Sequence, residues 1–378
     1  MTSENQVERR LEEWLQDAAQ PRLPQYFDDL LARTERTRQR PEWRFPSRWL
    51  LGRSIGSPAG LRHPAWALLL VTLLALGGLV VAAGALRQNL EPRPYFITGA
   101  ALPAILLPGQ DTIWASGSTE ILRIDPKTNV ATTIIRDLPP GHHSTVGLGD
   151  SIWTVHDELG TVTEYDAATG QELTTIQLNA GLAEPLAAYG SVWIPNYAEG
   201  AVVRIDAATG AIVATIEVAT SNVGIPTIMA SGGGLVWLAN GGAGAVLGID
   251  PADSRVARTI PVCADGVAYG FNRLWLRACG NATLAVHDAA TVELVGTVEV
   301  DVLALGVEAR DRMWWPLRDG PAGSTTLVGV DPLTLAVTAE YVAPVEAETM
   351  TAGVDSFWFG AATGTEVVRI PFALLPAP

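Results

Sequence analysis

Short apolar runs separated by glycine-containing turns make up most of this chain from residue 94 onward. Seven runs carry a tryptophan, and successive tryptophans stand 39, 40, 44, 38, 39 and 44 residues apart. They are Trp114, Trp153, Trp193, Trp237, Trp275, Trp314 and Trp358. The residues beside each tryptophan are mostly apolar on consecutive positions, which is typical of a strand buried on both faces. We therefore expect these tryptophans to fill the core between sheets and not to bind a ligand.

The third repeat shows best how many strands each copy contains. Turn residues separate its apolar runs, which lie near Leu186–Tyr189, Ser191–Ile194, Ala201–Asp206 and Ala211–Val218. A period near 40 residues with four strands per copy is typical of one blade of a β-propeller. Seven copies therefore predict an all-β fold, a closed propeller of seven four-stranded blades.

Six repeats share an Asp-x-x-Thr-Gly turn, complete or in variant form, between the predicted third and fourth strands. The turns begin at Asp125, Asp166, Asp206, Asp250, Asp288 and Asp331. An Asp carboxylate accepts hydrogen bonds from backbone N–H groups two residues on, and the Gly supplies a left-handed residue. A calcium loop is the alternative, but each turn offers one carboxylate where calcium takes about six to eight oxygens. We interpret the turns as structural.

The seventh repeat lacks a good fourth strand. After its third strand, Thr365–Ile370, prolines crowd the sequence, whereas Pro94–Thr98 stands before the first repeat with nothing to pair with. We predict that strand 94–98 joins the last blade as its outer strand, because this pairing removes an exposed edge and closes the ring.

A much longer apolar run, Ala65–Leu86, has 22 residues without a charge or a proline. At about 1.5 Å per residue it is long enough to cross the hydrocarbon core of a bilayer. A buried core helix and a cleaved signal peptide ending near Ala83–Ala85 are the alternatives, but the segment before the run is too long for a signal peptide. We predict a tail over 1–63, a transmembrane helix over 64–86, a linker over 87–93 and the propeller over 94–378.

Charge changes sign at this apolar run. Residues 1–86 hold 11 Arg and 9 acidic residues, a balance of +2 (11 − 9), and residues 87–378 hold 14 basic and 31 acidic residues, a balance of −17 (14 − 31). Because arginine-rich flanks stay on the cytoplasmic side, we predict a single-pass protein of the cell membrane with a cytoplasmic N-terminus and an extracytoplasmic propeller. An acidic propeller repels phosphate backbones, which excludes nucleic acid as a partner.

The two cysteines agree with this location. Cys263 and Cys279 flank an expected hairpin that turns at Gly270–Asn272, so they face each other across neighbouring strands. A disulfide there persists in an oxidising compartment. Two buried free thiols are the alternative.

The predicted tail contains two short amphipathic helices, near residues 4–19 and Tyr26–Arg36, followed by arginines mixed with aromatic residues. Two interpretations stay open: a tether lying on the inner leaflet, and a docking segment for a cytoplasmic protein. Leu23–Pro46 resembles the cytoplasmic tails of some bacterial single-span, anti-sigma-like membrane proteins, which implies a regulatory role. The segment has no Cys or His, so the zinc-binding form of that pattern is missing.

The repeat text also resembles a known group of proteins. Gly190–Asn196 followed by Val203–Ile216 is similar to the YVTN and virginiamycin-B-lyase-like propellers, within the wider NHL and quinoprotein-like group. The resemblance covers residues 94–371 and implies the seven-bladed fold. In the lyase, histidines and acidic residues act with magnesium, so the resemblance implies such residues in the later blades of this chain. The later blades here carry one histidine, His287, at an apolar position, so no catalytic residue carries over.

In a propeller the connections between blades share a face with the loops between second and third strands, and ligands bind on that face. The candidate residues there are His142, His143, His156, Asp157, Glu158, Asn196, Tyr197, Glu199, Asn240, Arg318, Asp319, Glu346 and Glu348. The first five form the densest cluster, and mixed His and carboxylate ligands are able to hold a divalent metal. An ordinary solvated pair of loops is the alternative, and we assign no metal.

Two functions remain open. The first is a non-catalytic module that binds an extracytoplasmic ligand or protein as a sensor or scaffold, and that acts as a regulator through its tail. The alternative is a metal-dependent lyase- or hydrolase-like enzyme acting on an extracytoplasmic small molecule. The chain has only five histidines and lacks a nucleophile, phosphate-loop or zinc motif, which favours the first function. We assign no catalytic residue and no cofactor.

Overall fold

A computed structural model describes residues 92–98, 105–108, 112–117, 119–139, 141, 143–218, 228–280, 282–353, 355–362 and 366–377. The predicted tail and transmembrane helix lie outside these residues, as does most of the linker, and they stay predictions. Within the described ranges, no helix has the length and apolar character needed to cross a membrane.

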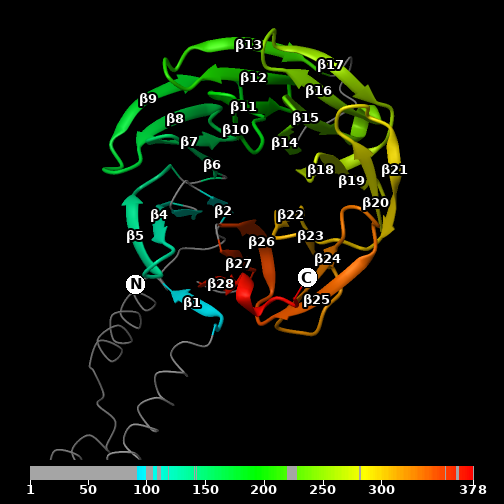
Figure 1. Cartoon of the computed structure of the whole chain (residues 1–378). Helices are drawn as coiled ribbons and strands as arrows, with labels where there is room; N and C mark the ends of the chain where they lie inside the picture. Colours follow the sequence, from blue (N-terminus) through cyan, green and yellow to red (C-terminus); the bar gives the residue numbers. More distant parts are fainter. Residues whose placement is uncertain are drawn as a thin grey trace, which may run out of the picture. The chain divides into compact units, whose positions relative to one another are not determined.

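The described residues form seven antiparallel sheets of four strands each, the blades of a propeller (Figure 1). Blade 1 contains β2 (Ile105–Pro108), β3 (Ile113–Ser116), β4 (Ile121–Asp125) and β5 (Val130–Ile135). Blade 2 contains β6 (His143–Leu148), β7 (Ser151–His156), β8 (Thr161–Asp166) and β9 (Glu172–Gln177). Blade 3 contains β10 (Leu186–Ala188), β11 (Ser191–Asn196), β12 (Ala201–Asp206) and β13 (Ile212–Glu217).

The later blades follow the same order. Blade 4 contains β14 (Ile228–Gly232), β15 (Leu235–Asn240), β16 (Ala245–Asp250) and β17 (Arg255–Ile260), with the 3-10 helix η1 (Gly241–Ala243). Blade 5 contains β18 (Ala264–Gly270), β19 (Arg273–Ala278), β20 (Thr283–Asp288) and β21 (Leu294–Glu299). Blade 6 contains β22 (Val307–Ala309), β23 (Arg312–Pro316), β24 (Thr325–Val330) and β25 (Val337–Ala343). Blade 7 contains β26 (Ala347–Ala352), β27 (Ser356–Ala361) and β28 (Glu366–Pro371), followed by η2 (Phe372–Leu374).

Blade 7 takes its fourth strand from the other end of the ring's sequence. Strand β1 (Tyr95–Thr98) pairs antiparallel with β28, with Tyr95 opposite Arg369 and Thr98 opposite Glu366 (Figure 1). The innermost strands β2, β6, β10, β14, β18, β22 and β26 each contact the next, and β26 contacts β2 in turn. The predicted all-β, seven-bladed fold is therefore confirmed, and the ring closes through blade 7.

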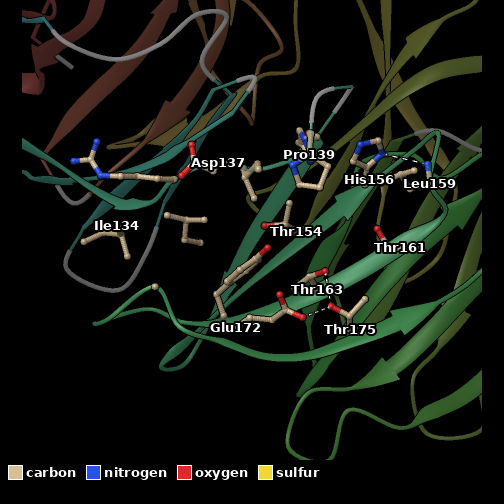
Figure 2. A pocket seen from close by; sticks show the side chains of 16 residues that line it. Ile134, Asp137, Pro139, Thr154, His156, Leu159, Thr161, Thr163, Glu172 and Thr175 are labelled. Atoms are coloured by element: carbon tan, nitrogen blue, oxygen red, sulfur yellow. Dashed lines mark hydrogen bonds between the residues drawn. The ribbon is translucent and has the colours of Figure 1, made fainter.

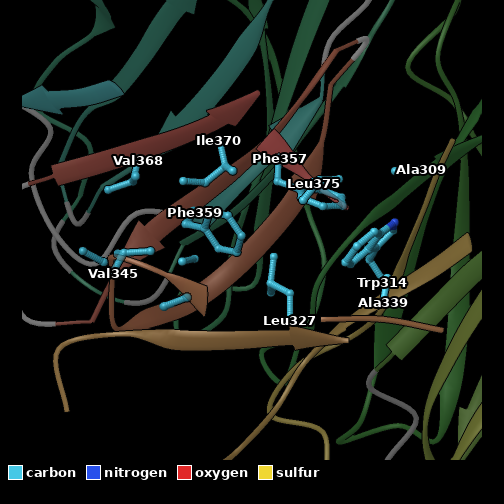
Figure 3. Packing of buried hydrophobic residues seen from close by; sticks show 13 residues of the cluster. Ala309, Trp314, Leu327, Ala339, Val345, Phe357, Phe359, Val368, Ile370 and Leu375 are labelled. Atoms are coloured by element: carbon cyan, nitrogen blue, oxygen red, sulfur yellow. The ribbon is translucent and has the colours of Figure 1, made fainter. Parts of the chain in front are cut away.

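The seven repeated tryptophans are all buried, as predicted. Each indole packs against the blade that follows: Trp193 of blade 3 lies with Leu238 of blade 4, and Trp358 of blade 7 lies with Ala115 of blade 1. Trp314 of blade 6 meets Phe357 of blade 7 edge to face, with ring centroids 5.7 Å apart, in the cluster drawn in Figure 3. Because the gap between blades widens outward, a large flat side chain at this position in every repeat fills it.

The repeated Asp turns have the structural role expected of them. Asp166 Oδ1 accepts hydrogen bonds from the N–H of Thr169 at 2.7 Å and from its hydroxyl at 2.6 Å, and Gly170 closes the turn at φ 72°. In other copies a side chain occupies the left-handed position, and in blade 5 it is Val292, at φ 59°. A β-branched residue is strained there.

Two blades add an arginine clamp, which we define as Arg204 or Arg369, opposite the blade's tryptophan on the neighbouring strand. The guanidinium of Arg204 stacks over Trp193, with 4.9 Å from its carbon to the ring centroid, and donates to the carbonyl of Pro251 in the next blade. Arg369 stacks over Trp358 at 5.3 Å and donates in the same way to the turn of blade 1.

A disulfide joins Cys263 and Cys279, whose Cα atoms are 5.5 Å apart. The two residues lie just before β18 and just after β19, a hairpin that turns at Phe271 and Asn272. The N–H of Cys279 also donates to the carbonyl of Cys263 at 3.1 Å. The bond therefore fixes the connection between blades 4 and 5 to the loop that follows β19.

Candidate functional site

Three candidate residues join blades 2 and 3 to each other. The hydroxyl of Tyr197 donates to Asp157, with 3.0 and 2.9 Å to the two carboxylate oxygens. This contact raises the pKa of Tyr197, because the hydrogen bond to the Asp157 carboxylate stabilises the protonated phenol. Glu199 accepts a hydrogen bond from the amide of Asn179, in the connection between these blades. These side chains therefore fix the loops to each other.

Two asparagines predicted to bind ligand are fully buried. Asn196 Oδ1 accepts from the N–H of Glu199 at 3.1 Å, and Asn240 Oδ1 accepts from the N–H of Ala243 at 3.2 Å. The amide group of Asn240 donates to the carbonyl of Val218. Each asparagine holds the loop after its own strand. Both side chains therefore support the loops from below and are not exposed to a ligand.

The remaining candidates on this face are exposed. Arg318 pairs with Asp301 at 3.2 Å, and Glu346 accepts from the N–H of Gly323 at 2.7 Å. Asp319 and Glu348 are also exposed. Arg318 lines a cleft between blades 5 and 6, away from the histidines of blade 2.

The cleft that Arg318 lines, between blades 5 and 6, has a volume of about 270 Å³. Asp265 and Arg277 line it together and pair at 2.6 Å, and Asp301 and Arg318 form its other ion pair. Sequence reasoning did not find Asp265, Arg277 or Asp301. A basic residue at Arg277, where a second strand is otherwise apolar, was the available signal.

The predicted histidine and carboxylate cluster divides in the structure. The rings of His143 and His156 meet edge to face, with centroids 4.5 Å apart, and His143 contacts the carbonyl of Pro139 through Nε2. His156 Nδ1 accepts from the N–H of Leu159 at 3.2 Å and lies 3.3 Å from Glu158. Asp157 turns toward blade 3 instead, and His142 lies outside the described residues. No set of three or more His, Cys, Asp or Glu side chains among the residues described is grouped to hold a metal.

A larger cleft, of about 480 Å³, opens between blades 1 and 2 (Figure 2). Its blade 1 wall is the end of β5 and the connection from Arg136 to Pro139, and its blade 2 wall is formed by β7, β8 and β9. Both His143 and His156 line it, together with several threonines and Tyr165. Burial, with the nearby charge of Glu172, raises the pKa of Tyr165 and keeps its hydroxyl protonated. We take this cleft as the candidate site.

Comparison with known proteins bears on the fold alone. No protein-family model matches the chain, and no curated protein matches it either. Among solved structures, a streptogramin B lyase superposes with a TM-score of 0.59 at 12% identity, over 75% of this chain and 98% of the other. Virginiamycin B lyase from Staphylococcus aureus gives 0.56 at 14% identity, over 74% and 99%.

BamB from Moraxella catarrhalis is a further structural neighbour. It superposes with a TM-score of 0.52 at 15% identity, over 70% of this chain and 85% of the other. All three matches support the propeller fold that the repeat text predicts. At these identities they carry no residue role and no activity to this chain.

Proposed function

We propose that this chain is a membrane-anchored, extracytoplasmic β-propeller that binds a ligand or protein without catalysing a reaction. The cleft between blades 1 and 2 is the observation that carries the proposal. Its volume of about 480 Å³ lies within the range of small-molecule sites, about 300–1,000 Å³. Its walls are two hydrogen-bonded sheets within a closed ring of blades, so the cleft is preformed.

The polar groups on the face that carries the connections between blades favour binding over catalysis. Asp157 accepts from Tyr197, Arg318 pairs with Asp301, and Glu346 accepts from a backbone N–H. A general base or a metal ligand needs a carboxylate directed at the substrate or ion. The carboxylates of Asp157, Asp301 and Glu346 are instead directed at other groups of the protein. We therefore prefer the binding function to the lyase-like alternative.

The disulfide and the apolar run support the location. Cys263 and Cys279 are bonded, as expected in an oxidising compartment. We expect full-length protein made in a bacterial host to resist extraction from membranes by carbonate, and added protease to cut the propeller in spheroplasts. Recovery of the chain in the carbonate wash, or full protection of the propeller, contradicts the anchor or its orientation.

Binding without turnover is tested by a thermal-shift screen of the full-length protein against sugars, amino acids, peptides and divalent metals. A ligand at about 100 times its Kd stabilises the fold by about 2.7 kcal/mol, which raises the melting temperature measurably. Each ligand that raises it is then incubated with the protein and analysed by mass spectrometry. Unchanged ligand supports the proposal. A chemically converted ligand contradicts it, and so does a screen in which nothing binds.

The predicted tail, 1–63, supplies a second part of the proposal, a cytoplasmic contact that reports on the propeller. Its test is affinity capture with residues 1–63 as bait, repeated with the basic arginines replaced by glutamine. We expect a partner that the native tail captures and the neutralised tail does not. Recovery of no reproducible partner counts against regulation and leaves the tail a membrane tether.

A further inference from the structure

One pair of threonines sets blade 2 apart from the other six blades. Thr154 follows the blade's tryptophan and lies opposite Thr163 on the neighbouring strand. Each other blade has two apolar residues at this paired position. They are Ala115 and Leu122, Ile194 and Val203, Leu238 and Leu247, Leu276 and Ala285, Trp315 and Val328, and Phe359 and Val368. Only in blade 2 does the face turned toward the preceding blade carry hydroxyl groups at this position.

The threonines continue across all four strands of blade 2. Thr145 lies opposite Thr154, and Thr163 lies opposite Thr175, so one straight row of four hydroxyl residues crosses the blade. Thr145 donates to the hydroxyl of Ser116 in blade 1 at 3.1 Å, and the hydroxyls of Thr163 and Thr175 are 3.0 Å apart. We call these four residues the threonine row.

Three members of the threonine row, Thr154, Thr163 and Thr175, line the cleft between blades 1 and 2. In Figure 2 they lie on its blade 2 wall, and Glu172 accepts from the hydroxyl of Thr175 at 2.9 Å. Thr154 is only 3% exposed, and its hydroxyl has no hydrogen-bond partner among the described residues. A buried hydroxyl at a position where an apolar side chain packs in six other blades weakens the fold. A use in binding accounts for its presence.

The geometry points to a neutral saccharide of one or two rings as the occupant, a proposal that rests on the binding function proposed above. A Thr hydroxyl donates one hydrogen bond and accepts two, as does each hydroxyl of a sugar, so a row of them matches a polyhydroxylated ring. Tyr165, which also lines the cleft, supplies an aromatic side chain for the apolar side of such a ring.

Charge in the cleft argues against an acidic ligand. Arg136 and Asp137 balance each other on the blade 1 wall, and Glu172 on the blade 2 wall adds one negative charge. Apart from its two histidines, the lining therefore sums to −1 (1 − 2), which disfavours an anion. The volume of about 480 Å³ accommodates a disaccharide with some ordered water.

The test compares full-length wild-type protein with the double variant Thr154→Val and Thr163→Val. Valine matches the apolar pair of blade 3, so the double variant is expected to melt at the same temperature or higher. Thr215→Val is the matched control, because Thr215 holds in blade 3 the register that Thr175 holds in blade 2. Thr163→Val alone, at a half-buried site, serves if the double variant does not fold.

The probes are an array of neutral saccharides, among them maltose, cellobiose, lactose and N,N′-diacetylchitobiose, followed by titration calorimetry with the strongest binder. We expect the wild type and Thr215→Val to bind equally, and the double variant to bind at least tenfold more weakly. Equal binding by the double variant, or a wild-type array without a bound saccharide, overturns the proposal. Stabilisation by another ligand class in the thermal-shift screen, with a blank array, refutes the saccharide and retains the binding function. If neither the array nor the thermal-shift screen finds a ligand, the saccharide proposal and the binding function are both refuted.

Discussion

Replacing Arg369 with alanine tests whether the arginine clamp holds the ring together between blades 7 and 1. Arg369 is 8% exposed, and its Nε donates to the hydroxyl of Ser356 at 2.8 Å. Through Nη1 it reaches Asn129 Oδ1 at 2.9 Å and the carbonyl of Pro126, both in the turn of blade 1. The alanine variant loses all of these contacts at the junction where the two ends of the ring's sequence meet.

The magnitude follows from these contacts. A hydrogen bond from a charged donor typically contributes about 1.5 kcal/mol or more, which applies to the bonds with Ser356 and Asn129. The Asp355 carboxylate is 66% exposed, so its ion pair adds at most about 0.5 kcal/mol. Stacking of Arg369 over Trp358 and Tyr95 adds about 1 kcal/mol. Because water partly replaces the lost partners, we expect a net loss of about 3 kcal/mol, or about 5 °C in melting temperature for a domain of this size.

The assay is urea unfolding of the full-length protein followed by circular dichroism, with the slope checked for constancy between variants. Arg123→Ala is the matched control, because Arg123 lies opposite Trp114 in the same register but is exposed. We expect it to change the free energy of unfolding by less than about 0.5 kcal/mol. If Arg369→Ala is no more destabilising than Arg123→Ala, the clamp does not hold the ring.

Three further predictions concern the turns and the disulfide. Hydrogen bonds from Thr169 and Thr209 lower the pKa of Asp166 and Asp206 below the ordinary 3.8, so their stabilisation is present above about pH 4 and is lost as pH falls through the folded-state pKa. Asp166→Asn with Asp206→Asn therefore lowers the melting temperature at pH 7 and less at pH 2.5; an equal difference at both refutes this. Val292→Gly relieves a left-handed φ of 59° and should stabilise by about 0.5–1 kcal/mol, as thermal melts will measure; a lower melting temperature means that lost packing outweighs strain. Cys263→Ser opens a loop of sequence separation 16 and should cost about 3 kcal/mol, and a reductant should destabilise the wild type but not the variant.

The regular part of the fold was predictable because it repeats under one physical constraint. A buried indole such as Trp193 has to recur once per blade, and a turn such as that at Asp206 has to reverse the chain after each third strand. Both marks are therefore spaced by the architecture itself. The confirmed number of blades follows from counting them.

The candidate site was less predictable, because a polar residue in a loop does not show which way its side chain is directed. Asn196 and Asn240 look like surface residues in the sequence and are buried supports in the structure. Thr154 looks like an ordinary strand residue, and its importance appears only when its position is aligned with Ile194 and its five apolar counterparts. Residue type alone did not distinguish buried supporting residues from surface residues. The position of a residue within the repeat did distinguish them.

The pairing of β1 with β28 has a consequence for the order in which the molecule is made. Tyr95 leaves the ribosome long before Arg369, its partner across the seam, has been synthesised. Until then, both margins of the partly built ring carry unpaired backbone groups, a state prone to wrong association. Nascent chains of this protein therefore depend on protection until the very last blade emerges, and ribosome stalling before β28 should leave an aggregation-prone product.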